Sequence, residues 1–325
     1  MKEKGHFSLK SMIDTTLKNK FVGLHIGLPK TGTTSLQALC FEQHPDISYF
    51  GQTNVWDSLE AKTVLKAILF DNNDAQLRDD ANKVINKFLS NDKPLVISDE
   101  ALSLGEFMLR AGRWPIKTDH ELIAKRAYEV LGEAQVLIVL RNQPDWIESW
   151  QKQGLKNSKY IERNYDLWLK NDLGESAQHL FSLLDYEKLY KAYANVFGVD
   201  NVHVKLYENY TQSVEEIGVD FLCLFGIDPK RTQGIMADKK KNVSGKKFNA
   251  LPTAMYKIIR TKNIKKIISL IPKSIKNPLR KILQVEKKYI SLDEGCKTKI
   301  LRDYEDSNRR LFDLLGINAE GLGYF

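Results

Sequence analysis

The sequence predicts an α/β protein in which helices cover both faces of a central, mostly parallel β-sheet, with a helical extension at the C-terminal end. Two observations predict this fold class. Short apolar runs rich in Val, Ile and Leu recur along the chain, as expected for strands that are buried on both faces. Longer helical patterns separate these runs, so the strands are joined by crossover connections. No internal repeat at a period of about 20–50 residues is present.

The apolar runs place the elements in order. Predicted strands lie at 21–27, 94–100, 134–141 and 201–208. Predicted helices lie at 33–43, 58–70, 76–90, 121–131, 144–170, 185–197, 213–225 and 296–315. We expect one domain over residues 1–325, with its core at about 20–250 and a basic, helical extension at about 251–325.

Composition narrows the class of protein. The 325 residues are 42% hydrophobic, which is enough apolar material for a large core. Cys40, Cys223 and Cys296 are too scattered for a disulfide framework or a zinc site, and the six histidines form no metal-binding pair, so we expect no metal. The N-terminus has no apolar signal region, and no run approaches the roughly 18 apolar residues of a membrane-spanning helix. A cytoplasmic protein is therefore expected.

Positive charge is concentrated late in the chain. The formal net charge is +8, yet residues 239–290 alone hold sixteen basic residues and one acidic residue, which leaves the rest of the chain at −7. Within this region, 256–290 is basic and amphipathic, which suits peripheral contact with an anionic membrane at its inner face or with a polyanion. Aromatic residues are nearly absent between the basic ones, so no nucleic-acid partner is expected.

The strongest local pattern is HIGLPKTGTTSLQ, residues 25–37. A strand leads into Gly27 and a helix starts near Thr33, an arrangement whose backbone N–H groups and helix dipole bind phosphate. Gly27 and Gly32 have the Walker A spacing and Thr34 stands where its Ser/Thr belongs. Thr33, however, occupies the Walker lysine position, and the lysine comes earlier, at Lys30. The sequence predicts a phosphate loop that differs from that of an NTPase.

Two further groups are predicted at the same edge of the sheet. Arg141 ends a strand in LIVLRNQPDWIESW, and Ser149 follows on the next helix, so a guanidinium and a hydroxyl converge as a terminal phosphate requires. Another strand ends in ISDE, which places Asp99 and Glu100 near Lys30. Alternation sends the two carboxylates to opposite sides, so one of them faces the site. We expect this to be Glu100, with Asp99 as its orienting neighbour or as a helix cap.

The stretches GLPKTGTTSLQ and RNQPDWIES resemble the 5′-phosphosulfate and 3′-phosphate motifs of sulfotransferases that use 3′-phosphoadenosine 5′-phosphosulfate (PAPS). The C-terminal segment is similar to that of bacterial carbohydrate, heparan-sulfate-like members. The resemblance implies a P-loop-like three-layer fold, PAPS as co-substrate, adenosine 3′,5′-bisphosphate as product and a glycan or other hydroxyl acceptor. It implies catalysis by Lys30 and Glu100. The nucleotide-binding residues that it implies are Lys30, Thr31, Gly32, Thr33, Thr34, Ser35, Arg141, Ser149, Lys246 and Lys247.

Other residues are open to two interpretations. The run MLRAGRWP places Arg110 and Arg113 beside Trp114, which suits stacking on a sugar and contact with acidic groups, but also suits a solvated loop. His120 begins a helix from which it can reach a substrate cleft. His25 lies inside a strand and is interpreted as a packed core residue.

Three alternative functions remain at this point. An ATP-dependent small-molecule kinase would use LVISDE as a Walker B-like strand, but it lacks the Walker lysine and leaves Arg141 and Ser149 unexplained. A non-catalytic module would bind anionic surfaces through 256–290. A sulfotransferase acting on a lipid or small metabolite would share every motif above.

Overall fold

The chain folds around one parallel sheet. The computed structural model describes residues 21–51, 58–70, 74–90, 93–104, 119–156, 182–210, 215–236 and 292–325. Five strands pair in the order β2-β3-β1-β4-β5, and every pair is parallel. The strands are β1 (Val22–His25), β2 (Ser48–Gly51), β3 (Leu95–Ser98), β4 (Gln135–Leu140) and β5 (Val202–Leu206). The predicted parallel sheet is confirmed.

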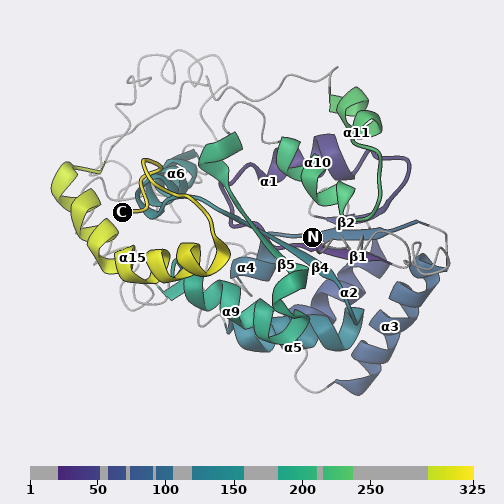
Figure 1. Cartoon of the computed structure of the whole chain (residues 1–325). Coiled ribbons are helices and arrows are strands. Elements are labelled where there is room, and N and C mark those ends of the chain that lie inside the picture. Colours follow the sequence, from purple (N-terminus) through teal and green to yellow (C-terminus); the bar gives the residue numbers. More distant parts are fainter. Residues whose placement is uncertain are drawn as a thin grey trace, which may run out of the picture.

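Helices cover both faces of the sheet, as Figure 1 shows. Side chains along β4 alternate between two buried clusters: Val136, Ile138 and Leu140 join one, while Leu137 and Val139 join the other. The helices that enclose the first cluster are α2 (Leu59–Phe70), α3 (Ala75–Leu89), α5 (His120–Leu131) and α9 (Tyr186–Phe197). The π-helix η1 (Leu36–Phe41) and α10 (Glu215–Cys223) enclose the second. The three-layer arrangement predicted from the strand pattern is therefore confirmed.

Aspartates begin four of the longer helices. Each N-cap carboxylate accepts a hydrogen bond from the backbone N–H three residues later, which satisfies one of the donors that a helix start leaves open. The caps are Asp74 for α3, Asp119 for α5, Asp185 for α9 and Asp293 for α15 (Glu294–Leu315). These local signals explain why the helices start where the sequence places them, to within two residues.

Some elements differ from the prediction. Strand β2 was not expected, and α11 (Pro229–Met236) also lies outside the predicted helices. The predicted helix at 33–43 is a short α1 (Thr33–Ser35) that continues as η1. The helix predicted at 144–170 is α6 (Gln143–Lys156), and residues 157–170 lie outside the described residues.

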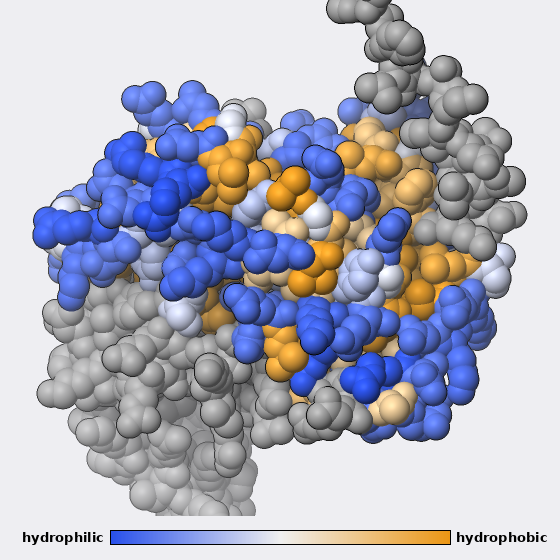
Figure 2. Space-filling model, turned by 60° about the horizontal axis from the view of Figure 1, so that its bottom comes forward, coloured by the Kyte–Doolittle hydropathy of each residue, from blue (hydrophilic) through white to orange (hydrophobic). Residues whose placement is uncertain are grey.

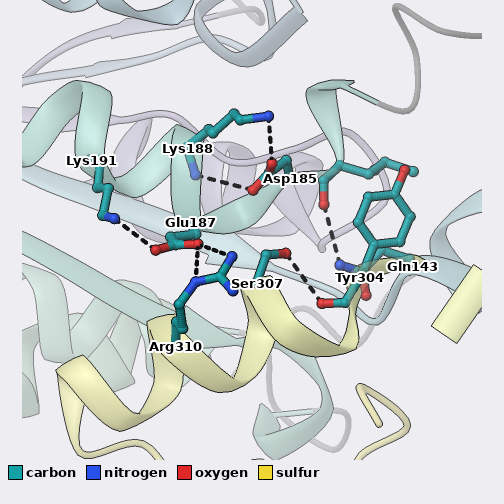
Figure 3. Close-up of polar contacts among 9 residues, drawn as sticks. Gln143, Asp185, Glu187, Lys188, Lys191, Tyr304, Ser307 and Arg310 are labelled. Atoms are coloured by element: carbon teal, nitrogen blue, oxygen red, sulfur yellow. Dashed lines mark hydrogen bonds and ion pairs between the residues drawn. The ribbon is translucent and has the colours of Figure 1, made fainter. Parts of the chain in front are cut away.

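The C-terminal helix α15 packs on α6 and α9. Its buried side chains recur every three or four residues, as on one face of a helix, and they are Ile300, Tyr304, Asn308, Leu311 and Phe312. At the edge of this contact the buried carboxylate of Glu187 on α9 accepts hydrogen bonds from Arg310 (2.9 and 2.7 Å) and Lys191 (2.7 Å), as Figure 3 shows. The apolar side chains of α15 join the first buried cluster. The boundary predicted near residue 251 lies outside the described residues and stays a prediction.

The outer surface mixes hydrophilic and hydrophobic residues. On the face in Figure 2, hydrophilic areas alternate with smaller hydrophobic ones. The large hydrophobic side chains that are exposed in the described part of the chain are Leu59, Leu122, Tyr128, Val199, Leu224 and Leu314. No helix within the described ranges is long and apolar enough to cross a membrane.

Candidate active site

The predicted phosphate loop connects β1 to α1 at the carboxyl end of the sheet. Two of its residues have positive φ angles, Lys30 (73°) and Gly32 (80°). Gly32 adopts this conformation freely, whereas a non-glycine residue such as Lys30 is strained there by about 1–2 kcal/mol. Strain of this kind is held in place by surrounding contacts and is concentrated at functional sites.

The hydroxyl groups of the loop are not equivalent. Thr31 is buried and donates to the carbonyl oxygen of Leu28 (2.6 Å), which closes the turn. Thr33 is also buried and donates to the Glu100 carboxylate. Thr34 is exposed and Ser35 is half-buried. The outward-facing hydroxyls of the predicted phosphate site are therefore those of Thr34 and Ser35.

Glu100 and Asp99 follow β3 and have different partners. Glu100 is 8% exposed, and burial raises the pKa of its carboxyl, against the opposing effects of the Thr33 hydrogen bond and the nearby Lys30 charge. Asp99 accepts a hydrogen bond from the backbone N–H of Ala101 (2.8 Å) at the start of α4 (Ala101–Leu104). Burial raises the pKa of Asp99 to about 6. Glu100 thus lies against the phosphate loop, while Asp99 caps a helix.

Arg141 joins the second predicted motif to the first. Its Nη1 donates to the carbonyl oxygen of Lys30 (3.0 Å), and its guanidinium lies 4.9 Å from the Tyr207 ring centroid. The hydroxyl of Tyr186, on α9, donates to the Arg141 carbonyl oxygen (2.5 Å). The Nε of Arg141 is buried and has no hydrogen-bond partner among the described residues. Ser149 lies half-buried on α6, and no hydrogen bond links it to Arg141.

Trp146 adds a contact that sequence reasoning missed. Its indole Nε1 donates to the carbonyl oxygen of Pro29 (2.6 Å). Its fully buried ring stacks on that of Trp150, with the two ring centroids 5.3 Å apart. The consecutive carbonyl groups of Pro29 and Lys30 are therefore both bound from the segment that follows β4. This segment therefore holds the strained loop from one side. In the sequence, the Trp of the RNQPDWIES motif is the feature that corresponds to the Pro29 contact.

A half-buried carboxylate, that of Glu208, supports the residue after Arg141. Glu208 Oε1 accepts from the backbone N–H of Asn142 (2.8 Å) and from its side-chain amide (3.0 Å). Glu208 Oε2 accepts from the hydroxyl of Tyr324 (2.8 Å), near the C-terminal end. Burial raises the pKa of Glu208, although these hydrogen bonds oppose the rise. Its role depends on contacts between distant parts of the chain, so no local motif could reveal it.

The remaining predicted residues lie elsewhere. The Nε2 of His120 is 2.8 Å from the carbonyl oxygen of Ser103, a contact that ties the start of α5 to α4. Five residues fall outside the described residues, so their predicted roles stay predictions: Arg110, Arg113, Trp114, Lys246 and Lys247. No group of three or more His, Cys, Asp or Glu side chains that could hold a metal occurs in the described part of the chain.

Two hollows lie beside the C-terminal tail rather than at the loop. One of about 660 Å³ is lined by the end of α15 and residues 317–325, and the other, of about 320 Å³, lies between the start of α6 and α15. Neither is lined by Lys30, Thr33 or Glu100. The candidate site is defined by the converging loop, acid and arginine, not by these hollows.

Comparison with known proteins gives one structural likeness to report. No family model matches the chain, and no curated protein sequence matches it. Among solved structures, it is similar to a sulfotransferase from Alicyclobacillus acidocaldarius, at 16% identity and a TM-score of 0.46, over 78% of this chain and 98% of that one. At such values, function has to be argued from the residues of the site.

Proposed function

We propose that the protein is a sulfotransferase that moves a sulfuryl group from PAPS to an acceptor hydroxyl. The observation that carries the proposal is the contact between the motifs: Arg141 is hydrogen bonded to the backbone of Lys30, and Glu100 to the side chain of Thr33. A phosphate loop, a basic group for a second phosphate and a carboxylate base thereby meet at one edge of the sheet, where ligands of parallel sheets bind.

The residues present fit a nucleotide that carries phosphates at both its 3′ and 5′ positions. Arg141 has a buried Nε–H that finds no partner in the described part of the chain, and such a donor is suited to a phosphate oxygen. Thr34, Ser35 and the backbone N–H groups of the loop suit the 5′-phosphate, and Arg141 with Ser149 suits the 3′-phosphate. Lys246 and Lys247 are proposed to add to the same site.

Each catalytic role follows from charge. PAPS supplies the sulfuryl group, and adenosine 3′,5′-bisphosphate is the product. Glu100 accepts the proton of the acceptor hydroxyl, since its raised pKa makes it a stronger base than an exposed glutamate. Lys30 stabilises the negative charge that develops on the leaving oxygen. The site needs no metal for either role.

A binding comparison tests the nucleotide specificity. We expect the protein to bind adenosine 3′,5′-bisphosphate without Mg²⁺ more tightly than ATP with Mg²⁺, as measured by calorimetry. The reverse order would contradict the proposal and favour the ATP-dependent kinase. Arg141→Lys keeps the charge but loses the guanidinium fork, so it should lose most of the preference for the bisphosphate over AMP.

We propose a carbohydrate as the acceptor and residues 256–290 as a contact for an anionic membrane or polyanion. The glutamate base and the C-terminal segment resemble carbohydrate-modifying members of the family, and the basic, amphipathic composition of 256–290 supports surface contact. A glycan array that reads sulfate transfer tests the acceptor, against lipid and small-metabolite controls. Co-sedimentation with anionic liposomes tests the segment, and equal pelleting of a Lys→Gln segment variant would contradict the contact.

A further inference from the structure

His25 is a buried titratable residue that the proposed chemistry does not use. It is the last residue of β1 and is 1% exposed. Its partner in the strand register is Ser98 on β3, and His25 Nδ1 lies 2.7 Å from Ser98 Oγ. The side-chain amide of Gln37, on η1, donates to both the carbonyl oxygen (3.1 Å) and the hydroxyl oxygen (3.0 Å) of Ser98.

These contacts limit the hydrogen-bond roles at the ring. The Gln37 nitrogen only donates, so Ser98 Oγ accepts from it, and the Ser98 hydroxyl can donate its own proton to His25 Nδ1. An inverted Gln37 amide would set two oxygens against each other at the Ser98 carbonyl, which excludes that orientation. When the Ser98 hydroxyl donates to Nδ1, the imidazole hydrogen lies on Nε2. Burial lowers the pKa of His25 to about 3, so the ring is neutral at ordinary pH.

The other edge of the ring lies against the phosphate loop. A Cβ built on Gly27 would lie 2.6 Å from His25 Nε2 and 2.6 Å from the Thr33 methyl group, so only glycine fits at this position. The Nε2 is buried, and no residue within the described ranges hydrogen bonds to it. One ring thus contacts the floor of the loop at Gly27 and, through Ser98, the strand that ends two residues before Glu100.

We propose that His25 is a positioning residue that sets the phosphate loop and Glu100 relative to each other. The proposal rests on the sulfotransferase function above. The ring supports the backbone of the loop at Gly27, and its Nδ1 holds β3, and with it Glu100, in register beside β1. Gln37 fixes the orientation of Ser98 in this arrangement. A phenylalanine at position 25 would keep the support of the loop but lose the hydrogen bond to Ser98. An asparagine at position 25 would keep this hydrogen bond but lose the support.

Two variants separate the two roles. In His25→Asn the amide oxygen still accepts from Ser98, but the loop loses its support, so adenosine 3′,5′-bisphosphate should bind on the order of tenfold more weakly by calorimetry. In His25→Phe the support remains and the bond to Ser98 is lost, so binding should persist while the maximal rate of sulfuryl transfer falls by a similar factor. His203→Asn is the matched control. His203 lies on the edge strand β5, and its Nε2 is 2.6 Å from Gln135 Oε1 on β4, so this histidine also contacts a neighbouring strand.

The results expected for a merely structural histidine are different. Equal losses of binding and of rate in both variants, in proportion to their loss of thermal stability, would overturn the positioning role, and so would binding and rate that match wild type. If wild-type protein binds no bisphosphate, the proposed function falls and the inference falls with it. Binding that is unaffected by both variants overturns the inference alone.

A measurement on wild-type protein tests the proposal even where the variants fail to fold. Nitrogen NMR of histidine-labelled protein should show one ring with its hydrogen on Nε2 that does not titrate between about pH 5 and 8. This signal should shift on addition of adenosine 3′,5′-bisphosphate, because its Nε2 lies 2.6 Å from the position that a Cβ on Gly27 would take. The His203 signals should stay in place. A non-titrating ring that is unmoved by saturating bisphosphate would overturn the inference.

Discussion

Glu100 lies in surroundings that both oppose and favour its ionisation. Burial raises its pKa, while the hydroxyl of Thr33 and the charge of Lys30 lower it again. The effect of burial is the larger, so the pKa of Glu100 exceeds the ordinary glutamate value. Glu100 should therefore act as a base only when the pH is above this raised pKa. The value of kcat/KM for sulfuryl transfer should therefore fall as the pH drops through that raised pKa.

Removing the Thr33 hydroxyl should move this pH dependence. Thr33→Val deletes a hydrogen bond to the ionised carboxylate, so the pKa of Glu100 should rise further and the acidic limb of the profile should shift to higher pH. The pH dependence of kcat/KM measures the shift. Thr33→Ser keeps the hydroxyl and is the control. An unchanged limb in Thr33→Val would show that this hydroxyl does not influence the base.

Asp99 should reduce stability at neutral and alkaline pH. Its folded pKa, about 6, lies above its ordinary value of 3.8. Below pH 3.8 the carboxyl is protonated in both the folded and the unfolded protein, so it costs no stability. As the pH rises through 6, a buried charge forms and the free energy of unfolding falls. Asp99→Asn keeps an acceptor for the Ala101 N–H. Urea unfolding should show the variant more stable than wild type by about 2 kcal/mol near pH 8, and little different near pH 3.5. An equal difference at both pH values would contradict this interpretation.

At the scale of elements, α6 holds the phosphate loop through Trp146. Trp146→Phe keeps most of the packing on Trp150 but leaves the Pro29 carbonyl without its donor. We expect a loss of about 1–2 kcal/mol in unfolding free energy and several-fold weaker bisphosphate binding. Trp150→Phe keeps the ring stack and the Pro29 bond, so it is the control for binding. Comparable weakening in both variants would argue against a specific role for the Trp146 hydrogen bond.

The elements that the sequence predicted are those with strong local patterns. β1, β3, β4 and β5 are apolar runs between polar turns, and four of the longer helices begin at aspartate caps. β2 escaped prediction because its four residues, SYFG, lie at the edge of the sheet and show no apolar run; two of them are only half-buried. The change from α1 to a π-helix at Leu36 is a matter of hydrogen-bond register, which residue patterns do not encode.

For the candidate site, too, features with a local sequence pattern could be predicted, and features that depend on distant parts of the chain could not. The positions of the loop, Glu100 and Arg141 at one edge of the sheet could be predicted because each directly follows a recognisable strand. Trp146 and Glu208 could not, because their partners lie more than 60 residues away in the chain. The hydrogen bond that occupies the Thr33 hydroxyl was missed for the same reason.

At the scale of the whole molecule, hydrogen bonds connect the C-terminal residues to the elements around the sheet. Asn308, on α15, hydrogen bonds to Gln143 at the start of α6 and to the carbonyl oxygen of Tyr324. The hydroxyl of Tyr324 in turn bonds Glu208, which holds Asn142 beside Arg141. The tail is thus connected to the edge of the sheet that carries the candidate site.

Removing the Tyr324 hydroxyl should destabilise the sheet and the tail together. Tyr324→Phe leaves one oxygen of the half-buried Glu208 carboxylate without its donor, so the unfolding free energy should fall by about 1 kcal/mol. Tryptophan fluorescence and far-UV circular dichroism should report the same shifted midpoint. Tyr190→Phe is the control, since the Tyr190 hydroxyl makes no hydrogen bond in the described part of the chain. Two separate transitions would contradict a shared folded unit.

The central claim is that Glu100 is the base of a PAPS-dependent sulfuryl transfer. One measurement tests it most directly: transfer of labelled sulfate from PAPS to a glycan acceptor by wild type and by Glu100→Gln, with bisphosphate binding measured on the same samples. The account predicts that wild type transfers sulfate, while Glu100→Gln binds the bisphosphate and transfers none. A Glu100→Gln protein with wild-type transfer, or a wild type that transfers no sulfate to any hydroxyl acceptor, would contradict it.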